Sequence, residues 1–499
     1  MTTMARGTFA LALACMAGTT FAQLTGPSSS QSPYVLPTRA GVVTQSLLTA
    51  GDTVGGYMMV GIPDGSGAFN NGDGSFTFLV NHEIPSGSGG VRAHGSTGGF
   101  VSRWSIDAAT RTVISGRDHN TGASDVNTWN GTGFVQGTTA YSRLCSADLA
   151  KSSAYKFGGL GTDARLFLNG EEAGPEGRAF AHVVTGAGTN QSWQLPSLGR
   201  FSWENAMANP KAQAKTVVMG TDDTSNQGQV YMYVGNKQST GNDIERAGLT
   251  NGELYGVRVT GVPSETRPGA AVGRFDLYNH GDVRNTTGAD LNTASAANSV
   301  TNFLRPEDGA WDHRIGHEND FYFVTTDRFN SASQEGHSRL YRMRFDDITN
   351  PTLGGQVDML IDGFVSGPNM MDNICIDNLG RILIQEDIGG QDPLGAIWLY
   401  DIASQGLVKV AEHDPFRFDS SSSGFLTRDE EASGIIDATD ILGQGWFLMT
   451  DQAHYSVSGE QYEGGQLLAL YVDPSIVPAP GAAAVLGLGA LAGVRRRRA

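Results

Sequence analysis

Short apolar runs that end on acidic residues recur along this sequence and constrain its fold more than any other feature. Each run is rich in β-branched or aromatic residues, and an acid follows within a few positions. Clusters of Gly, Asn and Asp separate the runs, whereas long helical periodicity is scarce. The pattern predicts an all-β protein. The six runs are 76–80, 166–168, 216–219, 321–324, 382–384 and 447–449.

A second acid precedes four of these runs, with an apolar strand and a polar turn between the two acids. In an antiparallel hairpin, the start of the first strand and the end of the second share one edge. Six such modules predict a six-bladed β-propeller with irregular insertions, whose carboxylates line a central funnel. The alternative is that these acids are only turn residues, because Asp and Asn favour turns. The acid pairs are Glu204 and Asp222, Glu307 and Asp327, Asp372 and Glu386, and Glu431 and Asp451.

Both ends of the chain carry targeting features. Arg6, the apolar stretch 8–16 and Thr20-Phe21-Ala22 predict a secretory signal peptide over residues 1–22. Near the C-terminus, a Pro motif precedes the apolar stretch 481–494 and an Arg cluster. As a helix this stretch would span about 21 Å, short of the ~30 Å hydrocarbon core. It therefore predicts transient membrane engagement and not a permanent anchor.

The order of these C-terminal features resembles a PEP-CTERM sorting tail, here over residues 477–499, with Ala479 where that family usually has Glu. We expect an exported protein that resides in the periplasm, on the cell surface or outside the cell. Between the two ends we expect one propeller domain over residues 30–475, although 499 residues alone would suggest two to four domains.

Net charge limits the possible partners. The formal charge of −17 argues against nucleic acid, whose phosphates need a basic surface, and is compatible with bound cations. We expect a monomer. Only Cys145 and Cys375 follow the predicted signal peptide, too few for a disulfide framework. They could pair, or one could bind a metal.

Carboxylates gathered at one rim repel each other unless cations neutralise them, and oxygen ligands suit calcium. The candidate calcium ligands are Glu83, Glu171, Glu172, Glu204, Glu307, Glu386 and Glu431.

Two other residue types stand among these acids. Arg305 could clamp a phosphate group with its two-pronged guanidinium, or simply pair with Glu307 or Asp308. Free cysteines such as Cys145 most often fill a core, but a thiolate among carboxylates would favour a softer metal such as iron.

Several common catalytic signatures are missing. The sequence has no His-Glu-x-x-His, no Gly-x-Ser-x-Gly and no Walker A loop, which argues against zincins, serine hydrolases and P-loop nucleotidases. The Gly-rich stretch 64–74 lacks the spacing of an EF-hand, so we expect it to be a hairpin loop.

Six segments across residues 58–455 resemble the PhoX-type alkaline phosphatase family, in the same order. They are GIPDGSGAFNNGDGSFTFLVNHE, RLCSAD, RLFLNGEE, LGRFSWENAMANP, RPEDGAWD and MDNICIDNLGRILIQED. The resemblance implies a six-bladed propeller that hydrolyses phosphate monoesters with calcium and iron. It also implies that Cys145 ligates iron and that Arg305 contacts phosphate. Cys145 is followed here by Ser146-Ala147-Asp148, whereas the phosphatases have a Gly-rich continuation.

Carried over by motif, the resemblance makes Glu83, Glu172, Glu204 and Glu307 metal ligands. The function expected first is therefore a metal-dependent phosphoesterase that acts on small phosphate esters. Two alternatives stay open at this point. One is a non-catalytic surface propeller with structural calcium, and the other is a lactonase-type or other esterase propeller with a single calcium.

Overall fold

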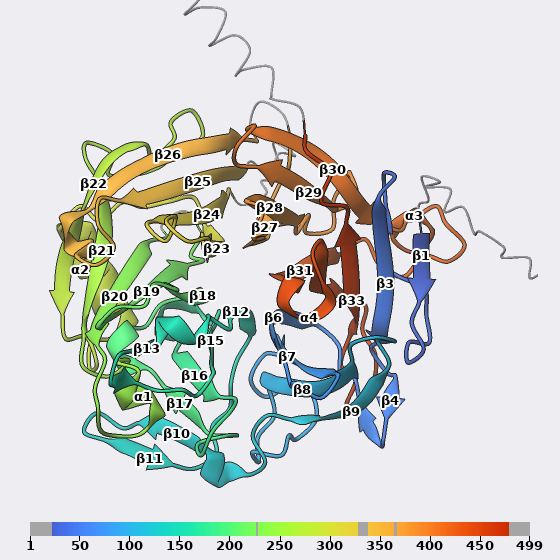
Figure 1. Ribbon diagram of the computed structural model, residues 1–499, viewed down its shortest axis with the longest axis horizontal. Helices are drawn as coiled ribbons and strands as arrows, with labels where there is room; N and C mark the ends of the chain where they lie inside the picture. The colour runs from blue at the N-terminus through green and yellow to red at the C-terminus, as the bar shows by residue number, and fades with distance from the viewer. Residues whose placement is uncertain (1–21, 226–227, 328–337, 364–366, 479–499) are drawn as a thin grey trace, which may run out of the picture.

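The computed structural model describes residues 22–225, 228–327, 338–363 and 367–478. Its sheets stand around a common centre, and each of the larger sheets turns one or two strands toward it (Figure 1). The described helices are short: α1 (Asp243–Arg246), α2 (Gly288–Ala297), α3 (Pro415–Phe418) and α4 (Thr439–Leu442). The prediction of an all-β, propeller-like protein is confirmed at this level.

Two sheets lie wholly within the first 200 residues. A four-stranded sheet has the order β6 (Pro63–Asn70), β7 (Ser75–His82), β8 (Phe100–Asp107) and β9 (Val113–Asp118). A six-stranded sheet has the order β11 (Phe134–Gln136), β10 (Val126–Trp129), β17 (Ser192–Gln194), β16 (Ala179–Val183), β15 (Leu166–Glu171) and β12 (Leu144–Asp148). Two small hairpins accompany them: β4 (Thr53–Val54) with β5 (Tyr57–Met58), and β13 (Lys156–Phe157) with β14 (Leu160–Gly161).

A nine-stranded sheet occupies the middle of the chain. Its first half runs outward through β18 (Trp203–Ala208), β19 (Lys215–Asp222), β20 (Val230–Asn236), β21 (Glu253–Val259) and β22 (Gly273–Gly281). Its second half returns inward through β26 (Gly355–Asp362), β25 (Ser338–Phe345), β24 (Asp320–Thr326) and β23 (Pro306–Trp311). Among the described residues, strand pairing joins the two halves only between the outer strands β22 and β26, over residues 273–275 and 355–357.

The two ends of the chain complete the last two sheets together. Strand β2 (Val35–Pro37) pairs with β30 (Gly406–His413), next to β29 (Ala396–Asp401), β28 (Arg381–Glu386) and β27 (Met371–Ile376). Strand β3 (Val42–Thr49) pairs with β33 (Gly464–Val472), beside β32 (Trp446–Ala453) and β31 (Glu430–Asp437). Strand β1 (Ala22–Thr25), before the predicted domain start at residue 30, pairs with β3. N-terminal and C-terminal residues therefore share sheets.

The strands nearest the centre form a closed ring. Strand β6 contacts β12, β12 contacts β18, and the contacts continue through β23, β27 and β31 back to β6. Apolar side chains fill the spaces between neighbouring sheets. For example, Phe201 stacks on Trp203 with ring centroids 3.9 Å apart, and both belong to one buried cluster with Tyr231. The ring therefore holds the inner strands in fixed positions around the axis.

Each of the six inner strands contains a β-bulge near its start. In each bulge, two residues of the inner strand stand opposite one residue of its partner, so one extra residue is inserted. We call these two residues the first and second inserted residues. The bulges span 63–66, 144–147, 203–206, 306–309, 371–374 and 431–434. Bulges redirect side chains, so the side chains near the start of every inner strand change direction at these positions.

Gly65 allows two inner strands to approach closely at such a bulge. A Cβ atom at this position would lie 2.2 Å from the backbone nitrogen of Ala147 on β12. The expected hairpin loop over 64–74 is wrong in its first part, because residues 63–70 form strand β6 and only 71–74 form the turn. The bulged strand pairs with β7 from Pro63 onward, and that pairing makes it a strand.

Some sequence predictions lie largely outside the described residues. These are the signal peptide, of which only Ala22 is described, and the sorting tail beyond Pro478. None of the helices in the described ranges has the length and apolar character that crossing a bilayer requires. Cys145 and Cys375 are both buried and free, so they do not pair with each other.

Candidate metal centre

Nine carboxylates and one thiol gather at the bulged ends of the inner strands, and we call this set the acid cluster. Within the described residues they form four groups whose potential ligand atoms lie within 4.8 Å of one another. The members are Asp64, Glu83, Cys145, Glu172, Glu204, Asp223, Glu307, Asp372, Asp387 and Glu431.

The bulges explain one half of the acid cluster. The first inserted position of five inner strands carries a potential ligand: Asp64, Cys145, Glu204, Glu307 and Asp372. On the sixth strand, Glu431 is the paired residue just before the bulge. Because the ring is closed, these side chains converge from strands far apart in sequence.

A repeated backbone hydrogen bond explains the other half. We call an inner strand and the strand that follows it a unit. In four units, the residue directly after the second strand donates its amide hydrogen to the backbone carbonyl of the residue just before the inner strand. That carbonyl lies two positions before the potential ligand in the bulge. The amide of Glu83 donates to Ile62 at 3.0 Å, and that of Glu172 to Arg143 at 2.9 Å. The amide of Asp223 donates to Ser202 at 2.8 Å and that of Asp387 to Met370 at 3.0 Å. Each bond folds an acid back over the mouth of the ring.

Three of the four groups share members and so form a continuous arc. Cys145 belongs both to the group with Asp64 and Glu83 and to the group with Glu172 and Glu204. Glu204 belongs also to the group with Asp223 and Glu307. The fourth group contains Asp372, Asp387 and Glu431. Shared ligands of this kind can bridge neighbouring cations.

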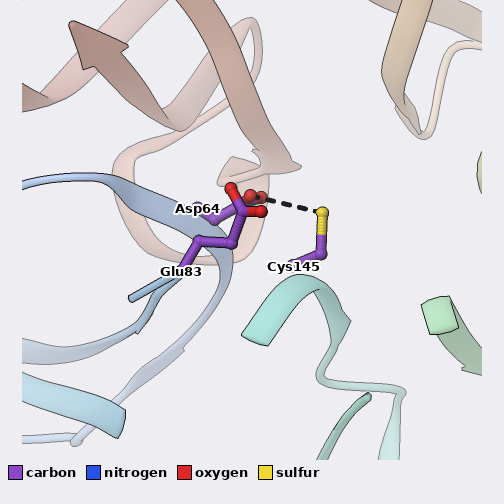
Figure 2. A group of neighbouring side chains, drawn as sticks. All are labelled: Asp64, Glu83 and Cys145. Atoms are coloured by element: carbon purple, nitrogen blue, oxygen red, sulfur yellow. Dashed lines mark hydrogen bonds between the residues drawn. The ribbon is translucent and has the colours of Figure 1, made fainter. Parts of the chain in front are cut away.

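Figure 2 shows how the first group converges from two sheets, with the carboxyls of Asp64 and Glu83 facing the thiol of Cys145. The Sγ atom of Cys145 lies 3.4 Å from Oδ2 of Asp64 and 3.1 Å from Oε2 of Glu204. The carboxyls of Asp64 and Glu204 are almost fully buried, and Oδ1 of Asp64 is buried without a hydrogen-bond partner. A buried carboxylate oxygen with no partner is the feature that a cation would satisfy.

Glu204 lies at the middle of the arc and is held from below. The hydroxyl of Ser146, the second inserted residue of β12, donates to Oε1 of Glu204 at 2.5 Å. The side-chain amide of Asn373, from the equivalent position of β27, donates to that hydroxyl at 2.5 Å. This polar layer beneath the acids fixes their orientation, as supporting residues do around metal ligands.

Electrostatic repulsion in the acid cluster is large. Two full charges 4.8 Å apart repel by about 3.5 kcal/mol at an effective dielectric constant of 20. Burial raises the pKa of Glu204 to about 8, and the charges of Asp223 and Asp308 add to the rise. Burial also raises the pKa of Asp64, and the charges of Glu83 and Glu431 raise it further. The ionised cluster therefore needs compensating positive charge.

The protein itself supplies part of that charge. Arg305 donates from Nε and Nη2 to the two oxygens of Asp223, at 2.6 and 2.8 Å, and its Nη2 lies 3.0 Å from Glu307. The predicted ion pair with Glu307 is therefore present, and Asp223 is the second partner in place of Asp308. Burial alone would lower the pKa of Arg305, but the charges of Glu307 and Asp223 raise it well above its ordinary value.

Gln452 on β32 and His454 directly after β32 touch the acid cluster. Nε2 of Gln452 lies 3.0 Å from Asp64, 2.9 Å from Glu83 and 3.4 Å from Glu431, so it joins two groups. His454 lies 3.6 Å from Glu431 and 2.7 Å from Glu463. Burial would lower the pKa of His454, but its bonds to Glu431 and Glu463 raise it to about 11, so it carries a positive charge.

The structure brings together seven of the nine residues proposed from the sequence. Glu83, Cys145, Glu172, Glu204, Glu307 and Glu431 belong to the acid cluster, with Arg305 beside them. Glu171 and Glu386 do not join it. Glu171 accepts from Nε and Nη2 of Arg178 at 2.7 and 2.6 Å. Glu386 accepts from Trp398 and from the backbone amides of Asn369 and Ala396. Their oxygens are already engaged.

Four members of the acid cluster were missing from the sequence-derived set: Asp64, Asp223, Asp372 and Asp387. Asp372 was visible as the acid upstream of Glu386. Asp223 and Asp387 directly follow Asp222 and Glu386, the acids that the strand pattern indicates, so a one-residue difference decides which member of each pair faces the centre. Asp64 lay in the stretch expected to be a loop.

The family profile of Alkaline phosphatase PhoX matches residues 186–434. This match supports a phosphoric ester hydrolase. The matched region contains Glu204, Asp223, Arg305, Glu307 and the fourth group, whereas Asp64, Glu83, Cys145 and Glu172 precede it.

Among solved structures, the fold is similar to Pseudomonas fluorescens PhoX in complex with vanadate, a transition state analogue. The similarity covers 91% of this chain and 98% of that chain, with a TM-score of 0.63 and 13% identity. A Penicillium chrysogenum alpha-L-arabinanase complexed with arabinobiose aligns over 83% of this chain and 95% of its own, with 10% identity and a TM-score of only 0.41. No curated protein sequence matches the chain.

The residues of the acid cluster fit metal ions. The donors are mainly carboxylate oxygens, the arc shares ligands between groups, and one buried oxygen has no partner. Carboxylates suit hard cations such as calcium, and the single thiol suits a softer metal.

Proposed function

We propose that this protein is an exported, metal-dependent phosphomonoesterase whose acid cluster holds calcium and iron. One observation carries the proposal: three ligand groups share Cys145 and Glu204 in one arc, and Arg305 stands at its end. The family match over residues 186–434 supports the same reaction class. Small phosphate esters are the substrates that such a site would take.

Iron is assigned to the part of the arc that contains Cys145, because thiolate is the softest donor in the acid cluster. Calcium is assigned to the groups that contain only carboxylates, above all Asp372, Asp387 and Glu431. When bound, such metals polarise phosphoryl oxygens and lower the pKa of an attacking water.

Arg305 has the geometry to orient the phosphoryl group. Its guanidinium already holds two carboxylate oxygens of Asp223 with two N–H groups, and phosphate oxygens present a similar pair of acceptors. We infer that phosphate competes with Asp223 for this fork and that Arg305 then stabilises charge on the equatorial oxygens. Glu307 keeps the guanidinium in place through its contact with Nη2.

The test is metal analysis of the purified protein combined with a phosphomonoester assay on the same sample. We expect iron with several calcium ions, hydrolysis of p-nitrophenyl phosphate, and inhibition by vanadate. Calcium alone without hydrolysis would favour a structural propeller. Calcium with ester or lactone hydrolysis would favour the other alternative. Either result would refute the phosphoesterase proposal.

We also propose that the ring has six blades. Six inner strands close the ring, and strand pairing in the described parts of the chain joins the halves of the nine-stranded sheet only through outer strands, so this sheet counts as two blades.

We propose as well that the protein is exported and loses residues 1–22 and the tail from residue 477. Mass spectrometry of the native protein tests both losses, and a mature protein that retains Arg495 to Arg498 would refute the loss of the tail.

A further inference from the structure

Arg143 occupies the same structural position as Arg305, on an inner strand two units away around the ring. Each arginine stands two residues before the first inserted residue of its bulge, which is Cys145 in one case and Glu307 in the other. Both have a positive φ, 48° for Arg143 and 51° for Arg305. Ile62 and Met370 occupy the same position on two other inner strands and also have a positive φ, so this backbone conformation belongs to the bulge.

The contacts of Arg143 parallel those of Arg305. Its Nη2 lies 2.7 Å from Oε1 of Glu83 and also contacts Oε2 of Glu172. Glu83 and Glu172 belong to the two groups that share Cys145. The guanidinium of an arginine stays protonated in proteins. Arg143 is therefore a cation held directly over the arc.

The two arginines flank one region of the acid cluster. Glu172, the partner of Arg143, lies with Glu204 in one group, and Glu204 lies with Asp223 and Glu307, the partners of Arg305, in the next. A tetrahedral anion above Glu204 would thus have a guanidinium on either side.

Arg143 differs from an arginine that only neutralises a carboxylate. Arg178 is such a residue, because its Nε, Nη1 and Nη2 donate to Glu171, Thr139 and Ala140, and its side chain is 21% exposed. The contacts of Arg143 with Glu83 and Glu172 both use Nη2, whereas Arg178 binds Glu171 through Nε and Nη2 together. The side chain of Arg143 is also 44% exposed, which makes it reachable from solvent.

We propose that Arg143 is a second phosphate-contacting residue that grips the substrate phosphate opposite Arg305. The inference rests on the proposed function and deepens it. Two guanidinium forks favour a phosphate monoester, with two negative charges and three free oxygens, over a diester with one charge. Substrate selection for monoesters therefore depends on Arg143 as well as on the metals.

The experiment measures binding of inorganic phosphate to the metal-loaded protein by equilibrium dialysis, beside the metal content. The variants are Arg143→Gln, Arg143→Lys and Arg305→Gln, with Arg178→Lys as the matched control. We expect Arg143→Gln to retain its metals and to bind phosphate about 10- to 100-fold more weakly. Arg143→Lys should recover part of the affinity, because it keeps the charge and loses the fork. Arg178→Lys should bind as the wild type does.

The outcomes separate this inference from the proposed function. If the metal-loaded wild type binds no phosphate, the proposed function fails and Arg143 has no such role. If Arg305→Gln loses phosphate while Arg143→Gln binds it with wild-type affinity, only the role of Arg143 is refuted. A loss of metal in Arg143→Gln, with unchanged phosphate affinity per loaded molecule, would show that Arg143 merely holds Glu83 and Glu172, and would also refute the inference. The ratio of monoester to diester hydrolysis should fall in Arg143→Gln and stay constant in Arg178→Lys.

Discussion

Glu204→Gln should change the free energy of unfolding in opposite directions with and without metal. Glu204 is 1% exposed and belongs to two of the linked groups, so its carboxylate helps to bind cations. Glutamine has nearly the same shape and can still accept the hydrogen bond of Ser146. The substitution therefore removes one negative charge with little change in packing.

The magnitude in the metal-free protein follows from the pKa of Glu204. Burial raises this pKa from the model-peptide range near 4.5 to about 8, so the folded state keeps a proton that the unfolded state has lost. Stability therefore falls as pH rises from about 4.5 to about 8, by at most about 5 kcal/mol. Glu204→Gln escapes this loss. At pH 8 in EDTA the variant should be the more stable protein, by an amount on the order of 2 kcal/mol.

The sign reverses when metals are present. Binding to the folded state alone stabilises it by mass action, so the wild type gains from calcium and iron what the variant loses. Thermal denaturation at pH 5 and pH 8, in EDTA and in calcium with iron, measures all four conditions. Glu171→Gln is the control, because Glu171 is similarly buried but bonds to Arg178 outside the acid cluster. It should destabilise the protein under every condition. If Glu204→Gln does the same, Glu204 is only a structural hydrogen-bond acceptor.

Four further predictions test other parts of the structure. Gly65→Ala should lower stability by about 2 kcal/mol or more and reduce metal content, because a Cβ would meet the backbone of β12 at 2.2 Å; wild-type melting would contradict the close approach. Gln452→Glu should lower the melting temperature in EDTA at pH 8 and gain more than the wild type from calcium, since it adds a charge beside Asp64 and Glu83; equal melting in EDTA would show that Gln452 does not face them. Asp451, 2.8 Å away, raises the pKa of His413 to about 9 against the effect of burial, so the stability that this pair contributes is complete below about pH 6.5 and is lost as pH rises through 9. The pH profile of stability of His413→Gln should lack that decline. Removal of residues 22–49 should prevent recovery of a soluble folded protein, because β33 would lose β3; a cooperative, metal-binding truncation product would contradict this closure.

The sequence by itself determined the fold class and the ends of the strands at which the site lies. Apolar runs bounded by turn residues have the period and length of strands, and this local pattern survives in the folded chain. Acids at hairpin ends must meet at one edge, because antiparallel pairing dictates it. The register of Trp203 with Asp222 and of Glu431 with Gln452 confirms that geometry. Glu83, Glu204 and Glu307 could therefore be placed near each other from the sequence.

Only the tertiary structure decided which acid of each neighbouring pair faces the centre. Glu172 faces it and Glu171 does not, and the same holds for Asp387 and Glu386. Successive strand residues point to opposite faces, so a single inserted residue reverses the pattern. The bulges at Asp64 and Cys145 depend on pairing with strands β7 and β15, and on the approach of neighbouring inner strands. No local signal announces such a bulge, because contacts between residues distant in sequence create it. The same contacts place Arg143 beside Glu83, a residue 60 positions away along the chain.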